Sequence, residues 1–107
     1  MSGTRGEGLR RIEKEIAGEK AAALGRAGER LEQALTETRE LGEQLLRATD
    51  AERDRLADAY VSARQRTLQA RLALLIQREA LGLRRHATVD QQFPEPPSLD
   101  QLMRRRA

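Results

Sequence analysis

The stretch Thr49-Asp50-Ala51-Glu52 lies between two long segments whose apolar residues recur at helical spacing. A threonine followed three residues later by a glutamate is the pattern of a capping box, in which the Thr49 hydroxyl accepts a hydrogen bond from the Glu52 amide and the Glu52 carboxylate accepts one from the Thr49 amide. We therefore expect one helix to end near residues 47–50 and a second to begin at about Asp50. Because residues 47–50 include neither glycine nor proline, a single unbroken helix is the alternative.

The segment before this turn carries apolar residues at intervals of mostly three and four from Leu9 to Ala48. This spacing gathers them on one side of an α-helix, and no proline interrupts the segment. At a rise of about 1.5 Å per residue, such a helix is about 60 Å long. Residues 1–8 hold three glycines, a serine and a threonine, a composition that predicts a flexible leader.

The segment after the turn predicts a second helix from about Asp50 to Leu81, which ends at Gly82 because glycine adopts the left-handed conformation at little cost. Its apolar residues fall on two nearly opposite faces. One face holds Leu56, Ala59, Tyr60, Ala63, Ala70, Leu74 and Leu81. The other face holds Ala57, Val61, Leu68, Leu72, Leu75, Ile76 and Leu83. The first face can pack on the preceding helix of the same chain, and the second face needs a different partner.

An exposed apolar face usually marks association between chains. We therefore predict a homodimer in which two hairpins form a four-helix bundle, on a surface that could also bind another protein. The predicted interface consists of Val61, Leu68, Leu72, Leu75 and Ile76. The alternative is that the C-terminal segment covers this face within one chain, using Phe93, Leu99, Leu102 and Met103.

Residues 84–107 form a segment of different character. The stretch Phe93-Pro94-Glu95-Pro96-Pro97 is expected to be extended, since proline fixes its own backbone and restricts the preceding residue. Ser98-Leu99-Asp100-Gln101 repeats the capping pattern and predicts a short terminal helix. The predicted fold is therefore all-α, with a flexible leader (1–8), a long antiparallel helical hairpin (9–83) and an extended proline-containing tail with a short terminal helix (84–107).

A strip of small residues lies beside the apolar stripe of the first predicted helix, and it consists of Gly18, Ala21, Gly25 and Gly28. Glycine inside a helix costs about 1 kcal/mol relative to alanine. One interpretation is that another helix packs closely along this strip and offsets that cost. The other is that the strip is an exposed flank on which glycine has no role.

The sequence holds few residues that could carry out catalysis. It has no cysteine, which excludes disulfides, thiolate nucleophiles and zinc–thiolate sites, and its single histidine, His86, cannot supply a metal triad. The glycines lie in helical segments with no preceding strand and no Walker lysine, so no phosphate-binding loop is expected. We predict a non-catalytic protein without a cofactor or a metal ion.

The hydropathy of the chain also bears on its location. The longest apolar run, Leu72–Ile76, is five residues long, whereas a helix needs about 20 residues to span a bilayer. Residues 1–16 lack the apolar core of a secretory signal. We therefore expect a soluble, cytoplasmic protein that has no membrane partner.

Arginine is concentrated in the second predicted helix and just beyond it, where Arg64, Arg71, Arg78, Arg84 and Arg85 are candidate anion contacts, and again at the C-terminus, in Arg104–Arg106. Clustered arginines bind phosphate groups, so a nucleic-acid-associated protein is the alternative function. The chain has one phenylalanine, one tyrosine and no tryptophan, which leaves little aromatic surface for stacking on single-stranded bases. The favoured prediction is an interaction or scaffold module that acts through self-association.

Two further stretches have a recognisable pattern, Glu15-Ile16-Ala17-Gly18-Glu19-Lys20-Ala21 and Gln77-Arg78-Glu79-Ala80-Leu81-Gly82-Leu83-Arg84. With these stretches and its proline-bearing tail, the chain resembles a family of small, uncharacterised, all-helical proteobacterial proteins that are classed as a domain of unknown function. The likeness covers about residues 15–103. The tail departs from it, because Phe93 and three prolines stand where a tyrosine and a single proline are expected. The resemblance implies a compact helical protein of bacterial origin, and it brings no activity that could be assigned to residues of this chain.

Overall fold

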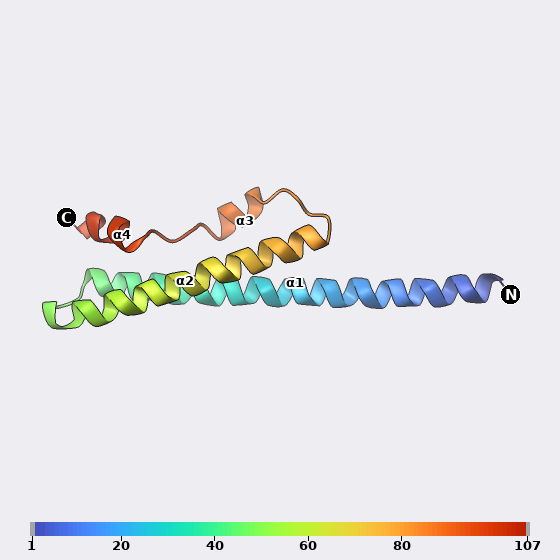
Figure 1. The fold of residues 1–107 in the computed structure, drawn as a ribbon, viewed down its shortest axis with the longest axis horizontal. Coiled ribbons are helices and arrows are strands. Elements are labelled where there is room, and N and C mark those ends of the chain that lie inside the picture. Colours follow the sequence, from blue (N-terminus) through green and yellow to red (C-terminus); the bar gives the residue numbers. More distant parts are fainter. Residues whose placement is uncertain (1, 107) are drawn as a thin grey trace.

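The computed structural model describes residues 2–106, and within this range it contains four helices and no strand. They are α1 (Ser2–Leu46), α2 (Asp50–Ala80), α3 (Ala87–Gln92) and α4 (Leu99–Arg106). α1 and α2 form a long antiparallel hairpin, and the residues after α2 run back along the hairpin toward its turn (Figure 1). The molecule measures 76 × 23 × 14 Å. The predicted all-α hairpin with a short C-terminal helix is confirmed.

The turn of the hairpin lies where the sequence predicted it, so the chain does not form one unbroken helix. Residues 47–49 separate α1 from α2, and the buried Ala48 anchors the turn in the core. The predicted side-chain cap is wrong, because the Thr49 hydroxyl donates to Glu52 Oε1 at 2.7 Å. The Glu52 amide instead donates to the backbone carbonyl of Thr49 at 3.1 Å. Because the hydroxyl proton points at the carboxylate, the side chains of Thr49 and Glu52 bond to each other. The hydrogen bond at the start of α2 is therefore made by backbone atoms alone.

The end of α2 is built by Gly82, as the sequence predicted. Gly82 has a φ of 82°, and its amide donates to the carbonyl of Glu79 at 2.9 Å. The amide of Leu83 donates to the carbonyl of Arg78, also at 2.9 Å. These two hydrogen bonds form a Schellman motif, which needs a left-handed residue at the position of Gly82.

The N-terminal end of α1 differs from the prediction. The helix includes residues 2–8, which were expected to be part of a flexible leader, while Met1 lies outside the described residues. Glycine lowers helix propensity by about 1 kcal/mol per residue, but extending an existing helix adds one backbone hydrogen bond for each residue that is fixed. Propagation from the long helix therefore continues through the glycines.

The core lies between α1 and α2 and has two clusters. The cluster near the turn is built around Leu45, Leu56 and Tyr60. The cluster further along the hairpin is built around Leu31 and Leu74. The face of α2 that was predicted to pack on α1 is therefore the buried one.

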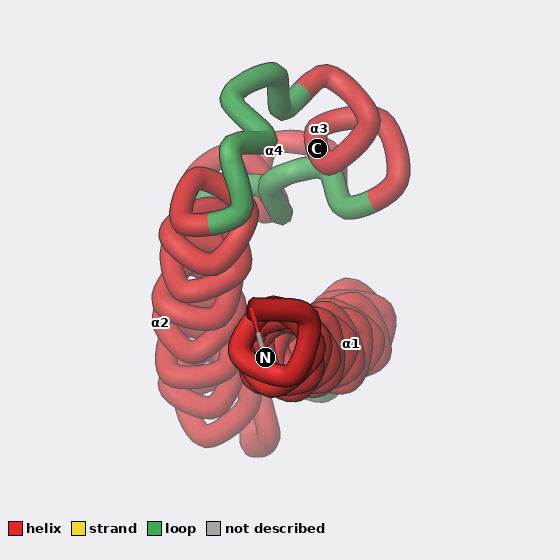
Figure 2. Tube along the Cα trace, turned by 90° about the vertical axis from the view of Figure 1, so that its right-hand side faces the viewer, coloured by secondary structure: helices red, strands yellow, loops and turns green. Residues whose placement is uncertain are grey.

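The tail packs beside this core. Val89 of α3 is buried in the cluster of Leu31 and Leu74, and Leu102 of α4 is buried in the cluster of Tyr60. Figure 2 looks along the hairpin and shows α1, α2 and the tail arranged around a common centre. No element was predicted where α3 lies, although Val89 and Phe93 are four residues apart and both contact the core.

Candidate interaction surfaces

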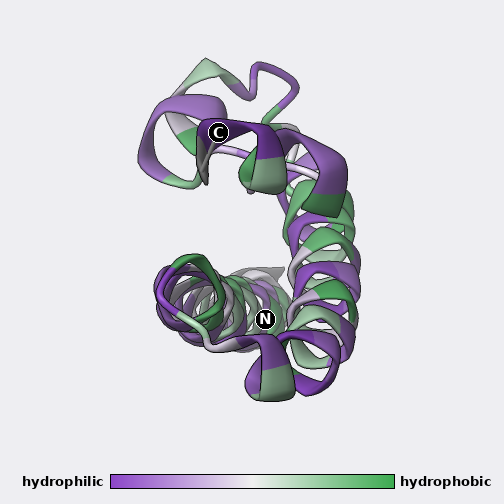
Figure 3. Ribbon diagram, turned by 90° about the vertical axis from the view of Figure 1, so that its left-hand side faces the viewer, coloured by the Kyte–Doolittle hydropathy of each residue, from purple (hydrophilic) through white to green (hydrophobic). Residues whose placement is uncertain are grey.

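The outer face of α2 is formed by Val61, Gln65, Leu68, Leu72 and Ile76, which recur at intervals of three and four and carry no charge. The exposed fractions of the three most accessible apolar residues are 48% for Val61, 59% for Leu72 and 56% for Ile76. Hydrophobic segments follow α2 along its length in Figure 3. This face is therefore an apolar stripe that solvent reaches.

The predicted oligomer interface lies on this face in large part. Val61, Leu72 and Ile76 are exposed, Leu68 is half-buried, and Leu75 is half-buried because it packs against the core cluster of α1 and α2. The alternative, in which the tail covers this face, is wrong. The apolar residues of the tail pack into the two core clusters instead, and they are Val89, Phe93, Leu99, Leu102 and Met103.

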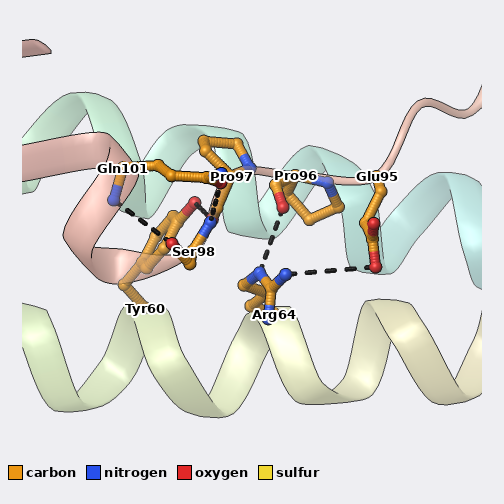
Figure 4. Close-up of polar contacts among 7 residues, drawn as sticks. All are labelled: Tyr60, Arg64, Glu95, Pro96, Pro97, Ser98 and Gln101. Atoms are coloured by element: carbon orange, nitrogen blue, oxygen red, sulfur yellow. Dashed lines mark hydrogen bonds and ion pairs between the residues drawn. The ribbon is translucent and has the colours of Figure 1, made fainter.

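The extended part of the tail is fastened to α2 by hydrogen bonds. The Tyr60 hydroxyl donates to the carbonyl of Pro97 at 2.6 Å, and Arg64 Nε donates to the carbonyl of Pro96 at 3.0 Å (Figure 4). The Arg64 guanidinium also lies 4.0 Å from a carboxylate oxygen of Glu95. Proline-rich backbone has few amide donors, so its carbonyls are free to accept from these side chains.

The terminal helix begins with the capping box that the sequence predicted. The Ser98 amide donates to Gln101 Oε1 at 3.0 Å, and the Gln101 amide donates to Ser98 Oγ at 3.2 Å. Both hydrogen bonds are visible in Figure 4. This reciprocal pair fixes the direction of α4 directly after the residues that Tyr60 and Arg64 hold.

Two more of the candidate anion-binding arginines also contact the tail. Arg71 forms an ion pair with Asp90 of α3. Arg78 donates from Nε to Nδ1 of His86 at 3.3 Å, and from its terminal nitrogen to the carbonyl of Arg85 at 2.8 Å. His86 Nε2 lies 3.2 Å from Glu79 Oε1, so both ring nitrogens of His86 have partners.

The sequence reasoning missed this role of the arginines, although a signal was present. Arg64, Arg71 and Arg78 are spaced by seven residues, which places them in one row along a helix. In the structure this row binds the tail from its proline segment to the start of α3. The side chains of Arg84 and Arg85 are exposed. The five candidate anion contacts therefore divide into three that fasten the tail and two that face solvent.

A pocket of about 400 Å³ lies between α1, α2 and residues 94–97. Leu35 and Leu102 give it apolar walls, while Arg39, Glu43 and Arg105 bring charges of both signs. Tyr60 also lines it, and burial raises the pKa of this phenol above its ordinary value of 10.0, with Arg64 and Arg105 acting in the opposite direction. Tyr60 is therefore protonated at neutral pH, as its hydrogen bond to Pro97 requires.

The strip of small residues on α1 is open within this chain. A Cβ atom placed on Gly18, Gly25 or Gly28 would meet nothing within 4 Å, and Ala21 is exposed. Close packing of another helix along this strip stays a prediction, since the contacts within this chain do not reach these glycines. A close approach does occur at Gly42, where a Cβ atom would lie 3.2 Å from Tyr60 Cε2.

The first part of α1 extends past the end of α2 (Figure 1). Ala80 and Leu81, at the end of α2, lie near Ile16, Ala17 and Lys20 of α1. Residues 2–16, which we term the α1 arm, therefore lie at or beyond the end of α2. The arm carries three exposed apolar side chains, with exposed fractions of 60% for Leu9, 54% for Ile12 and 46% for Ile16.

The part of the chain that the structure describes has neither a metal-binding cluster nor a membrane-spanning helix. No group of three or more histidine, cysteine, aspartate or glutamate side chains in residues 2–106 is placed to hold a metal ion. No helix in the same range has an apolar stretch long enough to cross a bilayer. Protein-family models, curated proteins and solved structures give no match to the chain. The resemblance to a helical bacterial family stays a prediction.

Proposed function

We propose that the protein is a non-catalytic interaction module that associates with a second copy of itself, and with helices of other proteins, through the outer face of α2. The observation that supports this proposal is the uncharged row from Val61 to Ile76, in which the three most exposed apolar residues are each about half accessible or more. Contiguous exposed apolar surface of this kind is typical of sites of protein association.

The same face on two copies gives a symmetric contact. In a two-fold interface each surface meets itself, and two hairpins that pack through their outer faces form a four-helix bundle. Gln65 lies between Val61 and Leu68 and can hydrogen-bond across such an interface without the cost of burying a charge. Leu72 is the most exposed apolar residue of the row.

The test replaces Leu72 with aspartate and measures the mass of the particle by light scattering. Leu72 is 59% exposed, so Leu72→Asp removes the apolar surface without opening the core. The matched control is Ala73→Asp, at an exposed position on the flank of the same helix. We expect the wild-type chain and Ala73→Asp to have the same mass, of at least two 12.0 kDa chains, and Leu72→Asp to have a lower mass. Equal masses for all three proteins would overturn the proposal.

A further inference from the structure

The pocket between α1, α2 and residues 94–97 has apolar walls that come from distant parts of the chain. α1 contributes Leu35 and Leu46, α2 contributes Tyr60, and α4 contributes Leu102. Leu35, Tyr60 and Leu102 are buried, so packing holds these walls in place. The pocket volume of about 400 Å³ lies within the range of small-molecule sites, which is about 300–1,000 Å³. The pocket can therefore accept the apolar body of a small molecule.

The extended part of the tail closes one side of this pocket, where Pro94, Pro96 and Pro97 line it. The Tyr60 hydroxyl donates to the carbonyl of Pro97 at 2.6 Å (Figure 4). Arg64 Nε donates to the carbonyl of Pro96 at 3.0 Å. Proline also has a fixed backbone torsion, so this wall is stiff as well as fastened. The pocket is complete only when the tail is docked on α2.

Four charged side chains also line the pocket, and they are Arg39, Glu43, Glu95 and Arg105. The Glu95 carboxylate lies 4.0 Å from the guanidinium of Arg64. No ion pair within residues 6–105 involves Arg39, Glu43 or Arg105. The charges without an ion pair in this range are therefore two positive and one negative.

Arg39 and Glu43 differ in how directly they face the pocket. At about 100° per residue, Arg39 lies about 40° around α1 from Leu35, and Glu43 lies about 80° from it. Leu35 is one of the buried walls. The guanidinium of Arg39 therefore starts closer to the apolar part of the pocket than the carboxylate of Glu43 does.

Arg105 brings a second guanidinium to the pocket from α4. Burial raises the pKa of Tyr60, and the positive charges of Arg64 and Arg105 oppose this rise, so both charges act on the pocket wall. Guanidinium groups bind carboxylates through two parallel hydrogen bonds, a geometry that neither a hydroxyl nor an ammonium head group offers. The charged part of the pocket therefore favours a carboxylate.

We propose that this pocket binds a small amphipathic carboxylate, whose apolar body packs among Leu35, Leu46 and Leu102 and whose head group pairs with Arg39 and Arg105. The outer row of α2 does not line the pocket, so this site is independent of the proposed association surface. Because residues 94–97 form one wall, a bound carboxylate also stabilises the docked tail.

Tyrosine fluorescence of the full chain tests the proposal, because Tyr60 is the single tyrosine and the chain has no tryptophan. The probe is octanoate, and 1-octanol and octylammonium are the neutral and cationic controls of the same chain length. We expect a saturable change with octanoate and at least several-fold weaker binding of both controls. Butyrate should also bind more weakly, since it buries less apolar surface. The absence of a saturable change with octanoate, or equal affinities for the three head groups, would overturn the inference.

Charge variants test the assigned head-group site. Arg39→Gln and Arg105→Gln change exposed residues, and each is expected to weaken octanoate binding several-fold and to leave that of 1-octanol unchanged. Arg30→Gln is the matched control, at an exposed arginine of α1 that does not line the pocket. Unchanged octanoate affinity in both pocket variants, or an equal loss in Arg30→Gln, would contradict the assignment.

Amide chemical shifts show where the probe binds. With octanoate we expect the amides of Gly42 and Leu102, which line the pocket, to shift more than that of Leu72 on the outer face of α2. Shifts confined to Leu72 and its neighbours would show adsorption on exposed apolar surface and overturn the inference. That result would leave the association of chains through the outer face of α2 to its own test.

Discussion

Thr38 of α1 and Thr67 of α2 meet in the middle of the hairpin, with their hydroxyl oxygens 2.9 Å apart. Both side chains are buried. The Thr38 hydroxyl also lies 2.9 Å from the carbonyl of Ala34, and the Thr67 hydroxyl lies 3.0 Å from that of Ala63. Two hydroxyl protons serve three contacts, so at any moment one threonine donates across the interface while the other donates to its own helix.

This pair predicts a non-additive effect on stability. Thr38→Val and Thr67→Val each remove the bond across the interface, so each is expected to lower the free energy of unfolding by about 1 kcal/mol. The double variant loses that bond only once, and its cost should be well below the sum of the two single costs. Urea unfolding followed by circular dichroism, at one chain concentration, measures all four proteins. Additive costs would mean that the two hydroxyls do not interact.

Tyr60 predicts a loss of stability at alkaline pH. Burial raises the pKa of Tyr60 in the folded chain above its ordinary value of 10.0. As the pH rises, the unfolded chain therefore releases the phenol proton first, so the stabilisation is complete below the unfolded pKa and is lost as the pH passes through the folded pKa. Between about pH 9 and pH 11, the free energy of unfolding should fall more steeply for the wild-type chain than for Tyr60→Phe.

The same group can be followed directly, since Tyr60 is the single tyrosine of the chain. Absorbance of the tyrosinate should titrate at a higher pH in the folded protein than in urea. Coincident titrations in the two states, or equal pH slopes for Tyr60→Phe and the wild-type chain, would contradict the assigned burial of the phenol.

Two glycines of α1 are expected to respond differently to alanine. At Gly25 a Cβ atom meets nothing within 4 Å, so Gly25→Ala should stabilise the chain by about 1 kcal/mol through helix propensity. At Gly42 the new atom would lie 3.2 Å from the ring of Tyr60 and 3.6 Å from Leu102, and the ring must shift to admit it. We expect Gly42→Ala to give no gain in thermal unfolding experiments. Equal increases in stability for Gly25→Ala and Gly42→Ala would show that the side chains of Tyr60 and Leu102 move aside without an energetic cost.

The arginine row predicts weak or no binding of nucleic acid. Arg64, Arg71 and Arg78 already contact the tail, which leaves Arg84 and Arg85 as the exposed members of the predicted anion site. We expect no retardation of duplex DNA or RNA in gels even at about 50 mM salt. Retardation that weakens with salt and is lost in an Arg84→Glu/Arg85→Glu variant would contradict this expectation and support the alternative function.

Several parts of the fold follow from residues that are close together in the sequence. The periodicity from Leu9 to Ala48 predicts the long helix, Gly82 predicts the end of α2, and Ser98 with Gln101 predicts the start of α4. Helical hydrogen bonds and caps join residues within a few positions of each other, so local sequence is enough to place them. The turn at Thr49 was predicted in the same way, although its side-chain hydrogen bond goes to Glu52 and not to the backbone.

The candidate surfaces could be predicted only in part. The row of Val61, Leu72 and Ile76 was found from helical spacing, and the structure leaves these residues exposed. The exposure of Leu9, Ile12 and Ile16 could not be found in that way, because it depends on where α2 ends relative to α1. That offset results from the packing of two helices of different lengths.

The sequence by itself therefore determined two helices, their turn and two apolar faces on the second helix. The tertiary structure decided which side of the hairpin the tail occupies. Both faces of α2 have comparable apolar residues. The hydrophobic effect is non-directional, so burial of apolar surface alone favours neither face for contact with the tail. The choice is made by directional bonds between distant residues, from Tyr60 to Pro97 and from Arg64 to Pro96, which hold the tail beside the core and leave the outer face of α2 open.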